Sequence, residues 1–237
     1  MIRNFLIENF PSLGRYKRFG KAWYDHIQPG KESYSQHRED VFIWKYLQRY
    51  DLKGSMYVDV GANHPSDISN SYLLYRHGLQ GVVIEPNLEL IKLFERFRKR
   101  DIALAIGCSN INTVLPFHIS KTPVLSSFAT NNREGTRTFR TRYLPVMQLD
   151  LAIAHIPLEF ISLLSIDVEG LNLQVLQGAR EIVKKALMIC LEFDTENDKQ
   201  EYLSILGPDF GVVREFGCNL ILVNQPLEAR ISRKETA

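Results

Sequence analysis

The stretch VDVGANHP, residues 58–65, joins a short apolar approach to a glycine and then to polar turn residues. Gly61 allows the backbone to bend sharply and allows another group to come close to it. Where a helix follows, the free N–H groups at its start can receive a polar or negatively charged part of a ligand. The stretch therefore has two interpretations. It is a buried strand that ends in a plain turn, with Asp59 hydrogen-bonded locally, or it is a strand whose tip holds a ligand.

The composition is that of an ordinary globular protein. The chain has 237 residues, of which 45% are hydrophobic and 24% charged, and a net charge of only +2, which does not favour a nucleic-acid binder. Its three cysteines are far apart and show no metal-binding or disulfide spacing, so a reducing, cytoplasmic location is expected. No apolar run is long enough to span a bilayer, and the interrupted N-terminus is a poor signal peptide.

Residues 1–32 are expected to form a helical extension ahead of one domain, residues 33–237. The extension mixes large apolar residues with four basic residues, Arg15, Lys17, Arg18 and Lys21. One interpretation is a helix with a solvated basic face. The other is a peripheral patch that rests on a membrane or on an anionic glycolipid.

Short apolar runs alternate with helical patterns along the rest of the chain, which predicts an α/β fold with a mostly parallel sheet of about seven strands. The chain closes with two apolar runs within 211–225 that predict an antiparallel hairpin. The polar segment 121–145 is expected to be irregular. The expected strands are 55–63, 81–87, 101–109, 114–120, 160–170 and 186–193, and the expected helices are 35–50, 69–78, 88–100, 172–185 and 198–206. Ligands of such sheets bind beyond the carboxyl ends of the strands.

A second acidic residue favours the ligand interpretation. Glu85 ends the expected strand GVVIE and follows the glycine turn at the distance typical of a carboxylate that accepts both hydroxyls of a ribose. GANHPS, however, lacks the second and third glycines of a dinucleotide fingerprint, so contact with a pyrophosphate is disfavoured. The pattern therefore favours S-adenosylmethionine over a nicotinamide dinucleotide.

The sequence SIDVEG, residues 165–170, places two further acids at a strand end. If the strand continues, Asp167 and Glu169 point to the same side of it. Two close carboxylates repel each other, so one can have a raised pKa and act as a base. They could instead bind Mg²⁺ or Mn²⁺, or one could anchor a loop.

Four ordered motifs together resemble the FkbM family of S-adenosylmethionine-dependent methyltransferases. They are SQHRED (35–40), YVDVGANHPSDISNSYLLYRHGLQGVVIEPN (57–87), LSSF (125–128) and LLSIDVEGLNLQVLQG (163–178). The resemblance covers residues 33–193. It implies a seven-stranded, Rossmann-like methyltransferase fold with the cofactor over the tips of the first strands. It also implies O-methylation of a sugar or of a glycan or natural-product precursor.

Matched position by position, the resemblance implies which residues form the site. The implied cofactor-binding residues are Gln36 at the methionyl end, Asp59, Gly61, Ala62, Asn63, Glu85, Pro86 and Asn87, with Asp101 and Ile102 at the adenine edge. Glu169 or Asp167 is the expected base, with His64 as an alternative, and Glu192 at another strand tip could face the acceptor.

The polar segment 121–145 is not covered by the motifs of the resemblance, and it carries Arg133, Arg137, Arg140 and Arg142. One interpretation, slightly favoured, is a solvated loop. The other is a lid that closes over the cofactor and binds a phosphorylated or nucleotide-linked sugar through its arginines.

Other classes of function remain open at this point. A nicotinamide-dependent oxidoreductase is disfavoured by the missing glycines. A non-catalytic sugar-binding protein that retains the fold is disfavoured by the intact acidic strand tips. RNA methylation is disfavoured by the near-neutral charge. The sequence leaves open the acceptor, a divalent metal and the oligomeric state.

Overall fold

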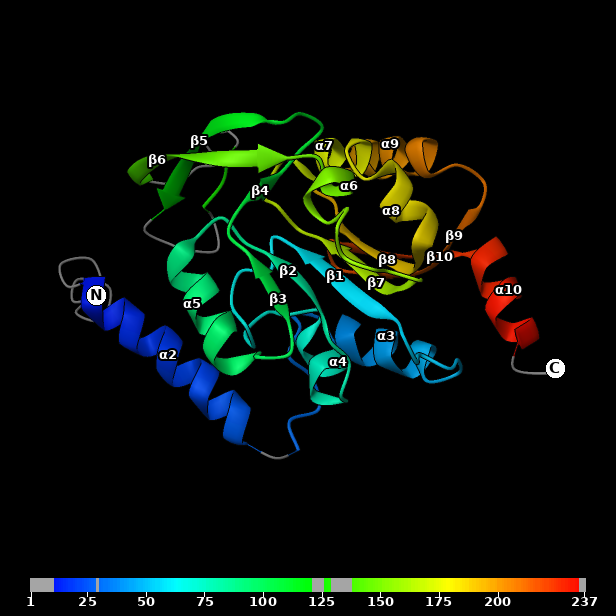
Figure 1. The fold of residues 1–237 in the computed structure, drawn as a ribbon, viewed down its shortest axis with the longest axis horizontal. Helices are drawn as coiled ribbons and strands as arrows, with labels where there is room; N and C mark the ends of the chain where they lie inside the picture. The colour runs from blue at the N-terminus through cyan, green and yellow to red at the C-terminus, as the bar shows by residue number, and fades with distance from the viewer. Residues whose placement is uncertain (1–10, 29, 121–125, 129–137, 235–237) are drawn as a thin grey trace.

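A seven-stranded sheet forms the centre of the molecule in the computed structural model, which describes residues 11–28, 30–120, 126–128 and 138–234 (Figure 1). The strand order is β3-β2-β1-β7-β8-β10-β9. The bounds are β1 Met56–Val60, β2 Gly81–Ile84, β3 Ile102–Leu104, β7 Ile161–Ile166, β8 Ala186–Glu192, β9 Phe210–Phe216 and β10 Asn219–Asn224. This order places β1 and β7 side by side at the point where the chain reverses direction across the sheet.

Strand directions confirm the expected α/β class. The pairs β1–β2, β2–β3, β1–β7 and β7–β8 are parallel, and β10 is antiparallel to both β8 and β9. The predicted C-terminal hairpin is therefore correct, and it turns at Gly217, whose φ of 55° lies in the left-handed region. All five residues of β1 are buried, as expected for a strand covered on both faces.

Helices cover the two faces of the sheet, and alternation along β1 separates the two cores. Val58 and Val60 pack in one core, beside α6 Leu149–Ala152, α7 Asn172–Gln177, α8 Arg180–Lys185 and α9 Glu196–Leu206. Tyr57 packs in the other, beside α3 Glu39–Leu47, α4 Tyr72–Arg76, α5 Leu88–Phe97 and α10 Gln225–Lys234. Figure 1 shows these two helical layers above and below the sheet. Asp59, between the two valines, points to the same side as Tyr57.

A small second sheet lies above the carboxyl ends of the first strands, with the order β4-β6-β5 (Figure 1). Its strands are β4 Gly107–Cys108, β5 Thr113–Ser120 and β6 Thr138–Met147. The expectation that 121–145 is irregular is wrong for its last part, because β6 pairs antiparallel with β5 along most of its length. The sequence does not reveal this strand, because its exposed face carries the large ring of Tyr143, 75% exposed, and its more buried face includes Arg142, so no apolar alternation marks it.

Two further segments differ from the sequence expectations. The helix predicted over 172–185 is split into α7 and α8, because a side chain at Gly178 would lie 2.2 Å from the carbonyl oxygen of Ser109 and the chain turns at this close approach. The chain also continues after the hairpin into α10, which packs Leu227 into the core.

The expected N-terminal helix is present as α2 Pro11–Ile27, and it packs against α5. Residues 1–10 of the expected N-terminal extension lie outside the described part of the chain. Among the described helices, none is both long enough and apolar enough to cross a membrane.

Candidate functional site

The turn after β1 brings the carboxyl ends of β1 and β7 into contact. Gly61 has a φ of 81°, and a Cβ there would lie only 1.8 Å from the carbonyl oxygen of Asp167. Asn63 also has a positive φ, 48°, a conformation that asparagine tolerates better than most residues. The glycine is thus needed for both its backbone conformation and the close packing of the two strand ends.

Glu85, directly after β2, carries a buried carboxylate at the same edge of the sheet. Its two oxygens accept hydrogen bonds from the backbone N–H groups of Asn63, at 3.0 Å, and Asn87, at 2.8 Å. Burial raises the pKa of Glu85 to about 7, although both hydrogen bonds favour the ionised form. A carboxylate oxygen has two acceptor lone pairs, so each oxygen can still accept from a ligand hydroxyl.

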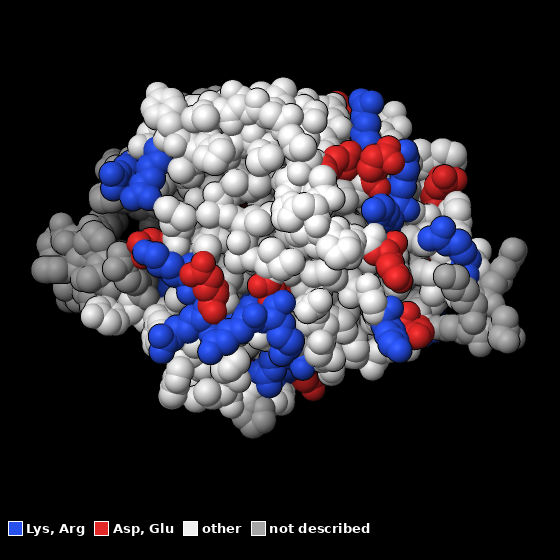
Figure 2. Space-filling view, viewed as in Figure 1, with Lys and Arg blue, Asp and Glu red and all other residues white. Residues whose placement is uncertain are grey.

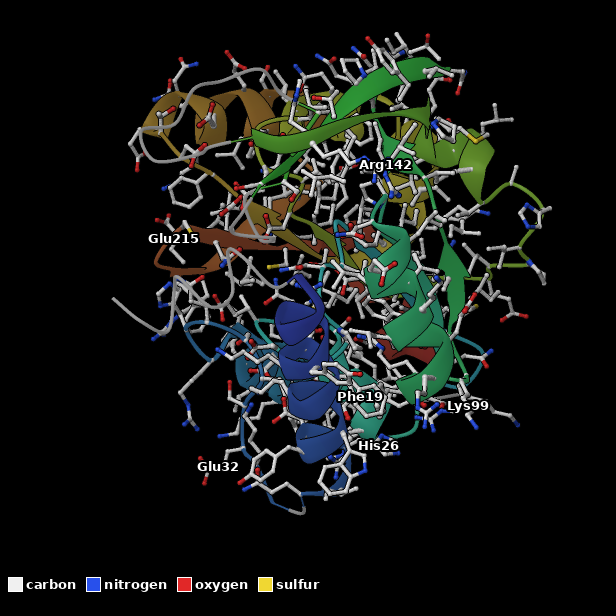
Figure 3. The ribbon with its side chains drawn as sticks, turned by 90° about the vertical axis from the view of Figure 1, so that its left-hand side faces the viewer. Phe19, His26, Glu32, Lys99, Arg142 and Glu215 are labelled. Carbon is white, nitrogen blue, oxygen red and sulfur yellow. The ribbon has the colours of Figure 1, made fainter. Side chains whose placement is uncertain are left out.

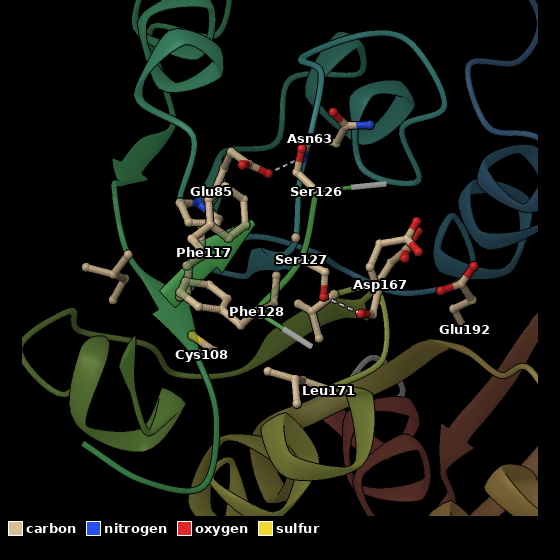
Figure 4. Close-up of a pocket in the computed structure, with 18 of the residues that line it drawn as sticks. Asn63, Glu85, Cys108, Phe117, Ser126, Ser127, Phe128, Asp167, Leu171 and Glu192 are labelled. Carbon is tan, nitrogen blue, oxygen red and sulfur yellow. Dashed lines mark hydrogen bonds between the residues drawn. The ribbon is translucent and has the colours of Figure 1, made fainter. Parts of the chain in front are cut away.

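Asp167 and Glu192 form a second acidic group, across the cavity from Glu85 (Figure 4). Asp167 follows β7 and Glu192 ends β8, the neighbouring parallel strand. Burial raises the pKa of Asp167 well above its ordinary value, and the charge and hydrogen bond of Glu192 raise it further. The two side chains are therefore neighbouring carboxyl groups, and their proximity disfavours the ionised form of Asp167.

The expected alternation of Asp167 and Glu169 along one strand is wrong. The strand ends at Ile166, and Glu169 lies in a turn with a φ of 51°. Glu169 still lines the cavity, and its carbonyl oxygen accepts a 2.6 Å hydrogen bond from the hydroxyl of Ser127. Its charge raises the pKa of Asp167 less than that of Glu192 does.

These groups surround a cavity of about 380 Å³, a size suited to a small-molecule ligand. Its other wall is apolar. Phe117 of β5 and Phe128 lie with ring centroids 4.8 Å apart, and Gly107 of β4 makes room for Phe128, since a Cβ there would lie 2.4 Å from that ring. The apolar lining is completed by Val60, Ile68, Ile84, Pro86, Ile106, Cys108, Val168 and Leu171.

The structure brings most of the expected site residues together. The cavity is lined by Gln36, Gly61, Asn63, Glu85, Pro86, Asp167, Glu169 and Glu192. Ala62 and Asn87 stand next to it, where the backbone N–H of Asn87 holds Glu85. Sequence reasoning gave no role to Phe117, Phe128 or Ile106–Cys108. The LSSF motif was a signal for Phe128, but the position of β5 was not available from the sequence.

Asp101 and Ile102 do not lie at the cavity, so the expected adenine edge is wrong. They stand at the beginning of β3, whereas the cavity lies beyond the ends of the parallel strands. Asp101 instead makes a buried ion pair with Arg98, 2.6 Å between Oδ2 and Nε, and Ile102 is 39% exposed at the edge of the sheet. The residues that do reach the cavity after β3 are Ile106, Gly107 and Cys108.

Asp59 lies beneath the cavity rather than in its lining. The hydroxyl of Ser71 donates to its carboxylate, and the same hydroxyl accepts a 3.0 Å hydrogen bond from Arg98. Burial raises the pKa of Asp59, and the Ser71 hydrogen bond and the charge of Arg98 oppose that rise. Asp59 thus supports the turn from below, as the first interpretation of the sequence proposed.

His64 is buried and lies outside the cavity lining, so it is not placed to act as the base. Its Nδ1 accepts hydrogen bonds from the backbone N–H groups of Ser66 and Asp67, and its Nε2 lies 2.9 Å from the carbonyl oxygen of Arg18 in α2. Burial lowers its pKa. This neutral imidazole joins the loop after β1 to α2.

Only part of the expected arginine lid can be placed. Arg133 and Arg137 lie outside the described residues. Arg140 is exposed and Arg142 half-buried on β6, and neither lines the cavity. Among the described residues, no group of three or more His, Cys, Asp or Glu side chains is arranged to hold a metal ion.

A known protein family matches most of this chain. The model of the methyltransferase FkbM domain matches residues 59–220, more than half of the chain. A solved structure, methyltransferase FkbM from Methylobacillus flagellatus KT, is similar with a TM-score of 0.47 and 13% identity, over 92% of this chain and 59% of that one. No curated protein matches. With a family match that includes the turn after β1, Glu85 and Asp167, the chain belongs to the FkbM methyltransferase family.

Proposed function

We propose that the protein transfers a methyl group from S-adenosylmethionine to a hydroxyl of a sugar or of a glycan or natural-product precursor. The buried carboxylate of Glu85 carries this proposal, because it faces a cavity between a glycine turn and an aromatic wall. S-adenosylmethionine is the usual cofactor of methyltransferases, and its adenosine has parts that match these surroundings. The ribose hydroxyls would donate to Glu85, and the adenine would lie against the apolar wall that contains Ile106 and Phe128.

Several features of the cavity fit the rest of the cofactor. Gln36 and Asn63 provide amide groups that can bind the polar methionyl part, and no cluster of glycine N–H groups is present in GANHPS to hold a pyrophosphate. When bound, S-adenosylmethionine supplies a methyl group that its sulfonium makes electrophilic. The residues of the chain must then hold the acceptor oxygen in line with that methyl group, which lowers the barrier by fixing the geometry.

The Asp167–Glu192 pair is the proposed general base. An alcohol is a weak nucleophile at neutral pH, so it must lose its proton as the oxygen–carbon bond forms and the carbon–sulfur bond breaks. An ionised carboxylate of this pair can take up the proton that the hydroxyl releases. A base whose pKa is raised towards the working pH is effective, and general-base catalysis typically contributes about 10²–10⁴-fold.

A sugar acceptor is supported by the acidic character of this end of the cavity. Asp167, Glu169 and Glu192 can together accept hydrogen bonds from several neighbouring hydroxyls, and such side chains suit a polyol. The proposed acceptors include nucleotide-linked and other phosphorylated sugars, whose phosphate groups Arg140 and Arg142 of β6 would bind. The expected cytoplasmic location stays a prediction.

The first experiment is isothermal titration calorimetry with S-adenosylhomocysteine on the wild type and on Glu85→Gln. Loss of hydrogen bonds to a charged group typically costs about 1.5–3 kcal/mol, so the variant should bind about 10-fold to 100-fold more weakly. Glu95→Gln, on the exposed face of α5, is the matched control and should bind like the wild type. Equal binding by Glu85→Gln and wild type would contradict the role of Glu85.

The second experiment incubates the protein with labelled S-adenosylmethionine and a panel of free and nucleotide-linked sugars. Transfer of label to a hydroxyl supports the proposed reaction. Binding of NADH in place of S-adenosylhomocysteine would indicate an oxidoreductase, and binding of a sugar without any transfer would indicate a non-catalytic sugar-binding protein.

A further inference from the structure

Helix α2 has an inner face that packs on the domain. The ring of Phe19 lies 5.3 Å from the ring of Phe97 in α5, and Ala22 is fully buried beside it. Figure 3 shows Phe19 between the two helices. Contacts with the loop after β1 also hold the helix. The hydroxyl of Ser66 donates to Asp25, and the imidazole of His64 contacts Arg18. The helix is therefore fixed in orientation.

The opposite face of α2 carries a second set of large apolar side chains. Tyr16, Trp23, Tyr24 and Ile27 form this outer stripe and are 72%, 51%, 52% and 52% exposed. Positions 16, 23 and 27 recur at the spacing of one helix face, and Gly20, between them, has no neighbouring atom within 4 Å of its Cβ position. Large apolar side chains are rarely grouped on a surface without a partner. Tyrosine and tryptophan are the residues that lie at the interface between a bilayer and water.

Basic side chains stand on both sides of the outer stripe. Lys17 and Lys21 lie on one side, although Lys21 is already paired with Asp25 and Asp67. On the other side, the guanidinium of Arg96 lies 5.1 Å from the Phe19 ring centroid. Helix α5 also exposes Lys92, which pairs with Glu89, and the turn after α5 exposes Lys99 and Arg100, whereas Glu95 is the exposed acid of this stretch. Figure 2 shows basic side chains gathered over this end of α5. The charge around the stripe therefore suits an anionic surface.

We propose that the outer stripe and the basic side chains around it form a docking surface for an anionic lipid bilayer. Helix α2 lies in the plane of the interface, with its aromatic rings among the lipid headgroups and Lys17 and Arg96 next to phosphate groups. Each basic side chain near an anionic membrane contributes about 1 kcal/mol, or roughly fivefold in binding. This proposal does not depend on the reaction proposed above.

The test uses the complete chain and two kinds of vesicle, phosphatidylcholine alone and phosphatidylcholine mixed with phosphatidylglycerol. Binding is measured by co-sedimentation at low and at high salt. Insertion is measured by fluorescence in a Trp44→Phe background, because the chain has two tryptophans and Trp44 is stacked on His77, with ring centroids 4.1 Å apart. We expect binding to the anionic vesicles, a blue shift of Trp23 emission on binding, and weaker binding in high salt.

Two double variants separate the apolar and the charged contributions. Trp23→Ser with Tyr24→Ser, and Lys17→Glu with Arg96→Glu, should each weaken binding to anionic vesicles at least tenfold. Their controls are Tyr143→Ser, on β6, and Lys53→Glu, in the loop before β1, which should bind like the wild type. The thermal unfolding temperature of each variant checks that the fold is retained.

Three results would overturn the proposal. One is equal binding to neutral and anionic vesicles, and another is binding with no shift in Trp23 emission. The third is a concentration-dependent dimer that Trp23→Ser with Tyr24→Ser abolishes, since a second copy of the chain would then cover the outer stripe instead of a bilayer.

Discussion

Two groups of buried carboxylates lie on the same sheet, and their surroundings differ. Below the sheet, the fully buried guanidinium of Arg98 pairs with Asp101 and is linked to Asp59 through the hydroxyl of Ser71. It also donates to the hydroxyl of Tyr57 at 2.9 Å. At the carboxyl ends of the strands, Glu85, Asp167 and Glu192 make no ion pair with any lysine or arginine of the described chain. The first group has the pattern of a structural network.

Burial of the carboxylates in the second group costs free energy, and no ion pair among the described residues offsets that cost. Burial raises the pKa of Glu85 to about 7, and burial with a neighbouring carboxyl raises that of Asp167. Perturbed carboxylates in a cavity are typical of functional sites, where a ligand supplies the missing partners. Burial of a carboxylate alone therefore does not mark the site in this molecule. The site is distinguished by buried carboxylates that have no lysine or arginine partner among the described residues.

The largest effect is expected from Asp167→Asn. Removal of the proposed base should lower kcat by about 10²–10⁴-fold. It should not lower the free energy of unfolding above pH 7, because it also removes a repulsion with Glu192. Steady-state kinetics and urea unfolding check both parts, with Glu201→Gln on the exposed face of α9 as the control. A variant that keeps full activity, or that loses several kcal/mol of stability, would place Asp167 with the structural group.

Arg98→Met should instead lower the stability of the fold. Breaking a buried ion network by removal of one partner costs about 3–5 kcal/mol, because Asp101 would remain buried without its cation. Urea unfolding measures the loss, and Arg96→Met, exposed two residues away, is the control and should change stability little. If Arg98→Met is as stable as the control, the network does not hold the fold together.

Tyr57→Phe should have a smaller effect on the same network. It removes the hydroxyl that donates to Asp101 and accepts from Arg98, and it leaves the ring packing intact. Loss of such hydrogen bonds typically costs about 1–3 kcal/mol. Affinity for S-adenosylhomocysteine should stay at the wild-type value. A large loss of affinity without loss of stability would show that the network acts directly on the ligand.

The smallest effect is the pH dependence of stability that Glu85 produces. Its pKa in the folded protein, about 7, is above the unfolded value of 4.5, so the free protein should lose stability as the pH rises through 7. Between pH 6 and 8 the loss due to this group is about 1 kcal/mol. Urea unfolding of wild type and Glu85→Gln at several pH values isolates it, since the variant lacks the titrating group. Parallel pH profiles would show that Glu85 does not titrate near 7.

The sequence predicts those features of the two carboxylate groups that local patterns determine. The apolar runs that end at Asp59, Glu85 and Asp167 identify strand tips, and parallel strand tips meet at one edge. Arg98 could not be recognised, because it lies in the basic run RFRKR, which looks like the solvated end of an amphipathic helix. Only its packing under β1 distinguishes it from the exposed residues beside it.

The errors at the site have the same origin. The resemblance implies that Asp101 lies at the cavity, but this residue stands at the start of the third strand rather than at its end. The partner of Asp167 is Glu192, 25 residues later in the sequence numbering, and only the pairing of β7 with β8 brings the two together. Long-range pairing of this kind leaves no local signal.

The most direct test of the account is calorimetry of S-adenosylhomocysteine binding at pH 7 in two buffers that differ in ionisation enthalpy. The ribose hydroxyls should bind the ionised form of Glu85, so binding should release about half a proton and the affinity should fall as the pH is lowered from 8 to 6. In Glu85→Gln the heat should no longer depend on the buffer. A wild-type heat that is equal in both buffers, or no binding at all, would contradict the claim that Glu85 binds the ribose of the ligand.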